Sequence, residues 1–199
     1  MDPEILKKKV EEAIDLLKKE KERKFNETVD LIINLQKFDP KKTSINTVVS
    51  LPYKIKDKKI AGFLETKNNK LDTITLDEFR KYNTKKELKV LVKKYDFFIA
   101  QSSLMPKVAS TFGKVLGPSG KMPSPQLGII INADDKIIDE LKNKINNSVK
   151  IRIKESSVKM AIGKRDMDKE KISENVVSVY NSLLKLLSKE KDNIKNIEI

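Results

Sequence analysis

The sequence contains no cysteine and no histidine among its 199 residues. Without cysteine, neither a disulfide bond nor a thiolate metal site can form. Without histidine, the chain lacks the usual general base of enzymes and the commonest protein ligand for metals. No motif combines paired carboxylates with a glycine or serine elbow, so a catalytic site would have to use Lys, Asp, Glu or Ser alone. We therefore expect a protein that is not an enzyme and that needs no cofactor.

Long apolar runs are also missing. No segment approaches the length of a membrane span, and the first four residues, Met-Asp-Pro-Glu, lack the layout of a secretory signal. The apolar share of 38% over 199 residues is enough for one large core or two small ones. We expect a cytoplasmic protein with no membrane partner.

Arginine is scarce, because only four of the 42 basic residues are arginine. An AT-rich genome would produce such an abundance of Lys, Asn and Ile, so the lysine count alone overstates the evidence. The net charge of +13 is the physically relevant quantity, and it favours an anionic partner, most commonly a nucleic acid. Any single lysine is by itself a solvated surface residue. The four arginines are Arg23, Arg80, Arg152 and Arg165.

The first part of the chain predicts a helix followed by two strands. Apolar residues recur at helical spacing after Pro3, which suits the first turn of a helix. Residues 25–35 and 45–51 then alternate between apolar and polar positions, and a turn at 39–42 separates them. The simplest interpretation is a hairpin. Glu27 is the exception to the alternation, because it falls on the apolar side of the first strand.

Between residues 59 and 147 the pattern changes to strands that alternate with helices. Short apolar strands are expected at 60–64, 73–76, 97–100 and 129–131. Helices are expected from Thr84, from Ser103 to a closing Gly117, and from Asp134. This order predicts a parallel sheet covered by helices, joined to a Gly/Pro/Ser loop at 117–125.

After residue 148 the alternating pattern returns, at 149–153 and 158–162, and predicts a second hairpin. A long helix capped by Asp168 and a last strand at 194–199 follow. The fold class is therefore α/β (α+β) with two domains. We expect a discontinuous two-layer domain, 1–58 and 148–199, and an inserted three-layer domain, 59–147, joined by two adjacent chain crossings that form a hinge.

Glu27 has two interpretations. A carboxylate on the buried side of a strand is costly unless it is paired, so a neighbouring lysine would be the structural partner. In the functional interpretation, Phe25 and Glu27 lie side by side at the solvent end of the sheet, where the ring stacks on a base and the carboxylate accepts from RNA. From the residues alone, the structural interpretation is slightly favoured.

Two basic segments are open to the same question. Gly117, Gly120 and Lys121 lie in a loop that fails as a nucleotide-binding motif, because the first glycine is misplaced and the loop follows a helix. It is either a surface loop or a basic loop that touches RNA. Lys150, Arg152 and Lys154 occupy one face of a strand, which either faces water or contacts phosphates together with Lys164 and Arg165.

Several short motifs stand in a fixed order along the chain: KFNETV at 24–29, YDFFIAQ at 95–101, LMP at 104–106, LGPSGKMP at 116–123 and IGK at 162–164. Together they resemble the L-one family of large-subunit ribosomal proteins, in its archaeal and eukaryotic branch. The resemblance covers nearly the whole chain, and the shared order is what makes it specific.

The resemblance implies a discontinuous RNA-binding domain and an inserted Rossmann-like domain. It implies binding to large-subunit rRNA at the mobile side stalk, help in moving tRNA out of the exit site, contact with other ribosomal components, and in prokaryotes repression of the protein's own mRNA. The RNA-binding residues carried over by position are Lys24, Phe25, Glu27, Thr28, Gly163 and Lys164, to which we add Asn196 in the last strand.

The sequence also departs from the family pattern. Ser119 replaces the usual arginine of the glycine loop. The family continues its last strand into a Thr-Met-Gly-Pro motif that also touches RNA, and this sequence reaches Ile199 without it. We expect either a shortened chain or affinity from other residues. Two alternatives stay open: a free RNA-binding repressor acting on its own mRNA, and an α/β enzyme with a pocket at the strand ends of residues 59–147.

Overall fold

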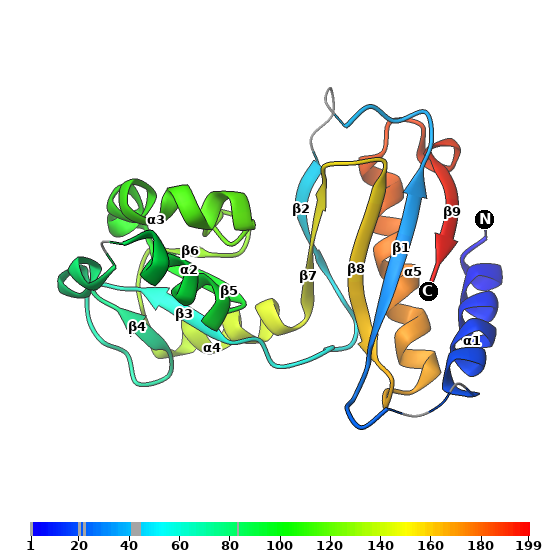
Figure 1. The fold of residues 1–199 in the computed structure, drawn as a ribbon, viewed down its shortest axis with the longest axis horizontal. Helices are drawn as coiled ribbons and strands as arrows, with labels where there is room; N and C mark the ends of the chain where they lie inside the picture. Colours follow the sequence, from blue (N-terminus) through cyan, green and yellow to red (C-terminus); the bar gives the residue numbers. More distant parts are fainter. Residues whose placement is uncertain (1, 20, 22, 41–44, 83) are drawn as a thin grey trace. The chain divides into compact units, whose positions relative to one another are not determined.

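The computed structural model describes residues 2–19, 21, 23–40, 45–82 and 84–199. It combines helices with several sheets, which confirms the predicted α/β class. The chain separates into two compact units (Figure 1). We call Met1–Ile55 with Asn147–Ile199 the first unit, and Lys56–Asn146 the inserted unit. None of the helices in the described ranges has the length and apolar character that a membrane span requires.

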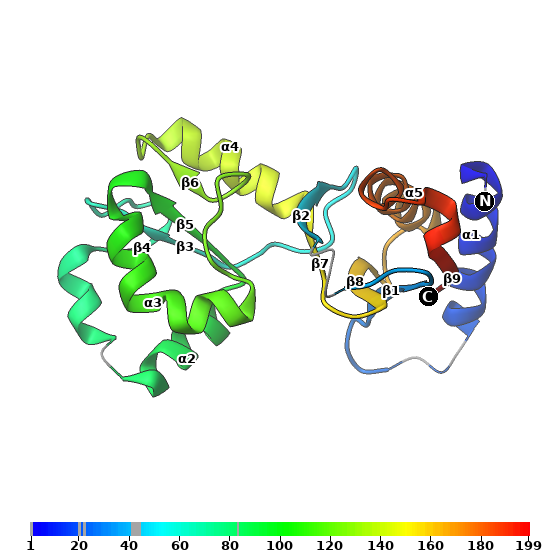
Figure 2. The same ribbon diagram turned by 90° about the horizontal axis from the view of Figure 1, so that it is seen from above.

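Two helices and two antiparallel sheets form the first unit. Helix α1 (Pro3–Lys19) packs against α5 (Lys169–Leu186), and both lie over one face of a three-stranded sheet (Figures 1 and 2). That sheet has the order β8–β1–β9, and a second sheet pairs β2 with β7. The strands are β1 (Thr28–Leu35), β2 (Ile45–Ser50), β7 (Ser148–Ile153), β8 (Ser157–Lys164) and β9 (Ile194–Glu198), and a 3-10 helix spans Glu190–Asn193.

The apolar patterns of the first unit form one core. On β1, Leu31, Ile33 and Leu35 are buried, as the alternation predicted, and they face the helices. The helical stripe of α1 buries Leu6, Val10 and Ile14 in the same core. The predicted strand start is wrong, however, because β1 begins at Thr28 and residues 25–27 precede it. Phe25 therefore does not take part in the alternation.

Both predicted hairpins are wrong. Strand β1 pairs with β8, from Thr28 opposite Lys164, and β2 pairs with β7, from Ile45 opposite Ile153. Alternation identifies a strand with one buried face, but it does not identify the partner strand. Here β2 leads into the inserted unit and β7 leaves it, so Ser50 lies opposite Ser148 where the chain departs and returns. Of the predicted turn at 39–42, residues 41 and 42 lie outside the described residues.

The inserted unit has a four-stranded parallel sheet in the order β4–β3–β5–β6. Its strands are β3 (Ile60–Phe63), β4 (Asp72–Ile74), β5 (Phe97–Gln101) and β6 (Ile129–Ile130). Helices α2 (Lys85–Lys94) and α3 (Met105–Ser119) cover one face, and α4 (Asp135–Asn146) covers the other (Figure 2). Phe98 packs toward α2 and α3, whereas its neighbour Ile99 packs toward α4. Two 3-10 helices span Leu76–Lys81 and Ser102–Leu104.

Helix α3 does not end at Gly117, as the sequence predicted. It continues through Gly117 and Pro118 to Ser119, and Gly120 forms the C-cap with a φ of 72°. A left-handed residue in that position is the common way to end a helix, and glycine adopts it without a steric cost. The predicted loop at 117–125 is therefore partly helical.

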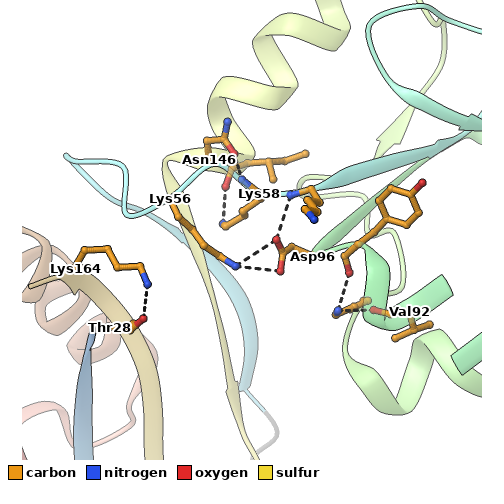
Figure 3. Close-up of polar contacts among 11 residues, drawn as sticks. Thr28, Lys56, Lys58, Val92, Asp96, Asn146 and Lys164 are labelled. Carbon is orange, nitrogen blue, oxygen red and sulfur yellow. Dashed lines mark hydrogen bonds and ion pairs between the residues drawn. The ribbon is translucent and has the colours of Figure 1, made fainter. Parts of the chain in front are cut away.

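The two ends of the inserted unit are tied to each other. The backbone N–H of Lys58 donates to the side-chain oxygen of Asn146 at 3.0 Å, and its Nζ donates to the Ile145 carbonyl at 2.6 Å (Figure 3). Burial lowers the pKa of Lys58 to about 8. Close by, Asp96 accepts from Lys56 Nζ at 3.2 Å and from the Lys59 N–H at 3.1 Å. The Lys58 bonds hold the start and the end of the unit together, and the Asp96 bonds fix the start against the residue before β5.

Candidate RNA-binding site

A hollow of about 750 Å³ lies in the first unit, between the end of α1 and the start of β1. We call it the Phe25 hollow. Its wall combines four cations with one aromatic ring, one amide and one carboxylate. This is the mixture that contacts phosphates and bases in RNA-binding proteins. The lining residues are Lys18, Arg23, Lys24, Phe25, Asn26, Arg165 and Asp166.

Glu27 organises the cations of this hollow. Its carboxylate forms ion pairs with Arg165 and with Arg23 Nε, the latter at 3.0 Å. The Arg165 N–H also donates to the Glu27 carbonyl at 3.0 Å, and the Arg165 guanidinium reaches the Lys18 carbonyl at 3.3 Å. The contacts of Glu27 therefore match the structural interpretation, in which the carboxylate is ion-paired within the protein. Its partners are arginines and not the expected lysine. Glu27 joins the loop before β1 to the end of β8.

Phe25 is unusually open to solvent for a phenylalanine. Its exposure is 65%, and it stands on the wall of the hollow. A large aromatic side chain left in water loses the free energy that burial would provide, roughly 1.5–3 kcal/mol. Two residues further on, Glu27 holds the end of this loop through its arginine pairs. The ring is therefore available to stack on a base.

Thr28 and Lys164 lie opposite each other on β1 and β8, and Lys164 Nζ donates to Thr28 Oγ1 at 2.6 Å (Figure 3). Gly163 precedes Lys164 and is buried. A Cβ at Gly163 would lie 2.8 Å from Ile172 Cγ1, a distance that real Cβ contacts do not show. Gly163 therefore allows α5 to approach β8 closely. The structure brings Lys24, Phe25, Glu27, Thr28, Gly163 and Lys164 to one end of the sheet.

The other predicted residues of the first unit lie elsewhere. Asn196 pairs with Asn34, six residues along β1 from Thr28, which is roughly 20 Å at the rise of a strand. Its side chain donates to Glu198 at 2.8 Å. Asn196 is therefore not part of the Phe25 hollow.

The basic strip lies in the other sheet and is shorter than predicted. Lys150 and Arg152 belong to β7, whereas Lys154 follows the last strand residue, Ile153. Arg152 is exposed and Lys150 is half-buried. Burial lowers the pKa of Lys150, and the neighbouring Arg152 lowers it further. The predicted face that is basic at every position is thus reduced to two strand residues.

The glycine loop of the inserted unit forms internal contacts. Gly117 is helical, and Gly120 is the C-cap of α3. Lys121 Nζ donates to the carbonyls of Val92 and Tyr95, at 2.7 Å each, and so caps the end of α2. Burial lowers the pKa of Lys121. The interpretation of Lys121 as a loop cation that faces RNA does not match these contacts.

Sequence reasoning missed four residues of the hollow, which are Lys18, Arg23, Asn26 and Asp166. Lys18 belongs to α1, and only the tertiary fold brings it to the loop. Arg23 could have been identified from the sequence, because it is one of four arginines in the chain and lies four residues before Glu27. Two arginines with one buried-side carboxylate predict an ion-paired cluster.

Comparison with known proteins identifies the class. Residues 17–199 match the Ribosomal protein L1p/L10e family, and the chain belongs to this family. Its members are structural components of the ribosome, so the prediction of a non-enzymatic ribosomal protein is confirmed, and the α/β enzyme is excluded.

Similar proteins include archaeal proteins named large ribosomal subunit protein uL1. The chain is 40% identical to the protein of Archaeoglobus fulgidus over 194 residues, covering 90% of this chain and 85% of the relative. It is 35% identical to that of Methanothermobacter thermautotrophicus, with 95% and 94% covered. It is 33% identical to that of Nanoarchaeum equitans, with 93% of each covered. The chain is therefore an archaeal-type member of the family.

Proposed function

We propose that this large-subunit ribosomal protein binds large-subunit rRNA at the mobile side stalk through the Phe25 hollow. The observation that carries the proposal is an aromatic ring with 65% exposure on the wall of a hollow that four cations line. The names of the archaeal relatives support the large subunit as the place of action. The site of action is then the cytoplasmic ribosome, with rRNA and other ribosomal components as partners.

The residues of the hollow divide into contacting and positioning groups. Phe25 stacks on an unpaired base, and Lys18 and Lys24 contact phosphates around it. Glu27 acts through Arg165 and Arg23, because both are ion-paired with its carboxylate. Thr28 and Lys164 extend the polar surface along the adjoining strands. Fixed cations around one exposed ring suit recognition of a particular RNA shape.

Assistance to the exit-site tRNA is the second part of the proposal. The resemblance to the side-stalk family supports it. The alternative is a free repressor that binds its own mRNA with the same hollow. Cosedimentation of the tagged protein with large subunits in a high-salt wash separates the two. A subunit component stays with the particle, whereas a free regulator is found in the supernatant.

The test of the hollow is Phe25→Ala, with Ile5→Ala as the matched control. Ile5 is another exposed apolar residue, at 52%, and lies thirteen residues before Lys18 on α1, roughly 20 Å away. We expect Phe25→Ala to weaken binding to a stalk rRNA fragment by about tenfold, since one base stack contributes about 1–3 kcal/mol. Filter binding at fixed salt measures the change. Equal affinities for the two variants would refute the assignment of the hollow.

A further inference from the structure

The basic residues of the inserted unit are concentrated in one short segment. Residues 80–94 contain seven cations and a single carboxylate, Glu87. Glu87 is occupied in the capping box at the start of α2, where it accepts from the Thr84 N–H at 3.0 Å. The segment therefore has a large local surplus of positive charge. The seven cations are Arg80, Lys81, Lys85, Lys86, Lys89, Lys93 and Lys94.

Helix α2 presents most of these cations on one side. Leu88 and Leu91 are buried in the core of the unit. Lys86, Lys89 and Lys93 follow each other at spacings of three and four residues, on the face opposite the two leucines. We call these three lysines the α2 face. All three are exposed, and none of them forms an ion pair with any residue that the structure describes.

A hollow of about 470 Å³ runs beside the α2 face. Lys86, Val90 and Lys94 line it at intervals of one helical turn, together with Tyr82 and Tyr95. Val90 is exposed at 61%, which is unusual for an apolar residue on a folded helix. Tyr82, which lines the same hollow, packs against Phe112, and the two ring centroids are 5.8 Å apart. Lys86 of the α2 face and the neighbouring Lys94 therefore border a small apolar and aromatic floor.

The charges of the other exposed helix, α4, are arranged differently. There Lys70 pairs with Asp139, and Asn68 donates to Asp135 at 2.8 Å. On α2, by contrast, lysines stand one turn apart from other lysines, and like charges at that spacing destabilise a helix. The α2 face therefore keeps unbalanced positive charge although this charge destabilises the free protein. Such a surface indicates an anionic partner that neutralises it.

We propose that the α2 face binds the phosphodiester backbone of a second RNA segment, with a base against Val90 and Tyr82. This inference rests on the proposed function, which places the protein among RNA. A row of three exposed lysines, of which Lys86 borders an apolar and aromatic floor, matches the way in which single-stranded RNA is bound without sequence preference. An acidic protein segment would meet the same lysines but would not need the aromatic floor.

The test uses the full chain with Lys86, Lys89 and Lys93 all changed to Gln. The matched control changes Lys107, Lys136 and Lys144 to Gln, which removes the same charge from exposed positions of α3 and α4 in the same unit. The probe is a labelled oligouridine, titrated over a range of salt concentrations. We expect the α2 variant to lower the slope of log affinity against log salt by about 2, at roughly 0.7 for each lost phosphate contact. The control should change it little.

Four outcomes decide the matter. Equal slopes for the α2 variant and the control would overturn the inference. Polyglutamate that displaces the labelled probe as effectively, charge for charge, as unlabelled oligouridine does would overturn the choice of RNA and indicate an acidic protein partner. Loss of stalk-fragment binding in Phe25→Ala with an unchanged oligouridine slope in the α2 variant would leave the proposed function standing without the second site. The reverse pattern would remove the Phe25 hollow and keep the α2 face.

Discussion

The two basic surfaces differ in how their cations are held. In the Phe25 hollow, Arg23 and Arg165 are paired with Glu27, and Lys18 Nζ donates to the Met167 carbonyl at 3.0 Å. On the α2 face, the three lysines have no ion-pair partner among the described residues. Held cations present a fixed pattern, which suits recognition of one RNA shape. Unpaired lysines provide a positive electrostatic potential without a fixed geometry, which suits salt-dependent attraction of phosphates without sequence preference.

The largest expected effect is a loss of stability on substitution of Gly163, which is buried near the Phe25 hollow. Gly163→Ala places a methyl group 2.8 Å from Ile172 Cγ1, so either the Ile172 side chain is displaced or β8 and α5 separate. We expect the free energy of unfolding to fall by about 1–3 kcal/mol, as for other overpacked cores. Urea denaturation followed by circular dichroism measures this change.

Gly113→Ala is the control for that substitution. Gly113 is in α3, and a Cβ there meets nothing within 4 Å. Because alanine favours a helix over glycine by about 0.5–1 kcal/mol, this variant should be more stable than the parent. A Gly163→Ala protein of unchanged stability that loses RNA affinity would show that the glycine faces RNA instead of the core.

The next effect concerns Glu27. If it acts through Arg23 and Arg165, then Glu27→Ala weakens stalk-fragment binding by about tenfold, and the same change made in a background with both arginines changed to Ala weakens it no further. Residues in one ion-paired network show this non-additivity. The four affinities of the double-mutant cycle, measured by filter binding, provide the test. Additive losses would mean that the Glu27 carboxylate contacts RNA directly.

Local features of the fold were predictable from the sequence, and distant pairings were not. The capping box of α2 depends on Thr84 and Glu87, three residues apart, and both reciprocal bonds are present. The buried side of β1 follows from alternation over a few residues. The partners of β1 and β2 lie about a hundred residues or more away along the chain. No local pattern shows which strands pair at that distance. The assumption that strands adjacent in sequence form hairpins was therefore wrong.

The candidate site shows the same division. Phe25, Glu27 and Thr28 are neighbours in sequence, so one motif identified them together. Lys18 joins them only through the packing of α1. Glycine was the least informative residue type, because Gly163 serves close packing and Gly120 serves a left-handed cap. The sequence marks both as special but does not say which physical requirement each one meets.

The smallest expected effect tests whether Lys121 belongs to the exposed or the internal cations. Lys121→Met removes two bonds to the carbonyls at the end of α2, so the free energy of unfolding should fall by about 1 kcal/mol. Lys114→Met, at an exposed position of α3, should have little effect. The salt dependence of oligouridine binding should be the same in both variants, because Lys121 Nζ faces carbonyls and not solvent. If Lys121→Met instead keeps its stability and lowers the slope, Lys121 contacts RNA, and the basic surface of the inserted unit extends beyond α2 to the glycine loop.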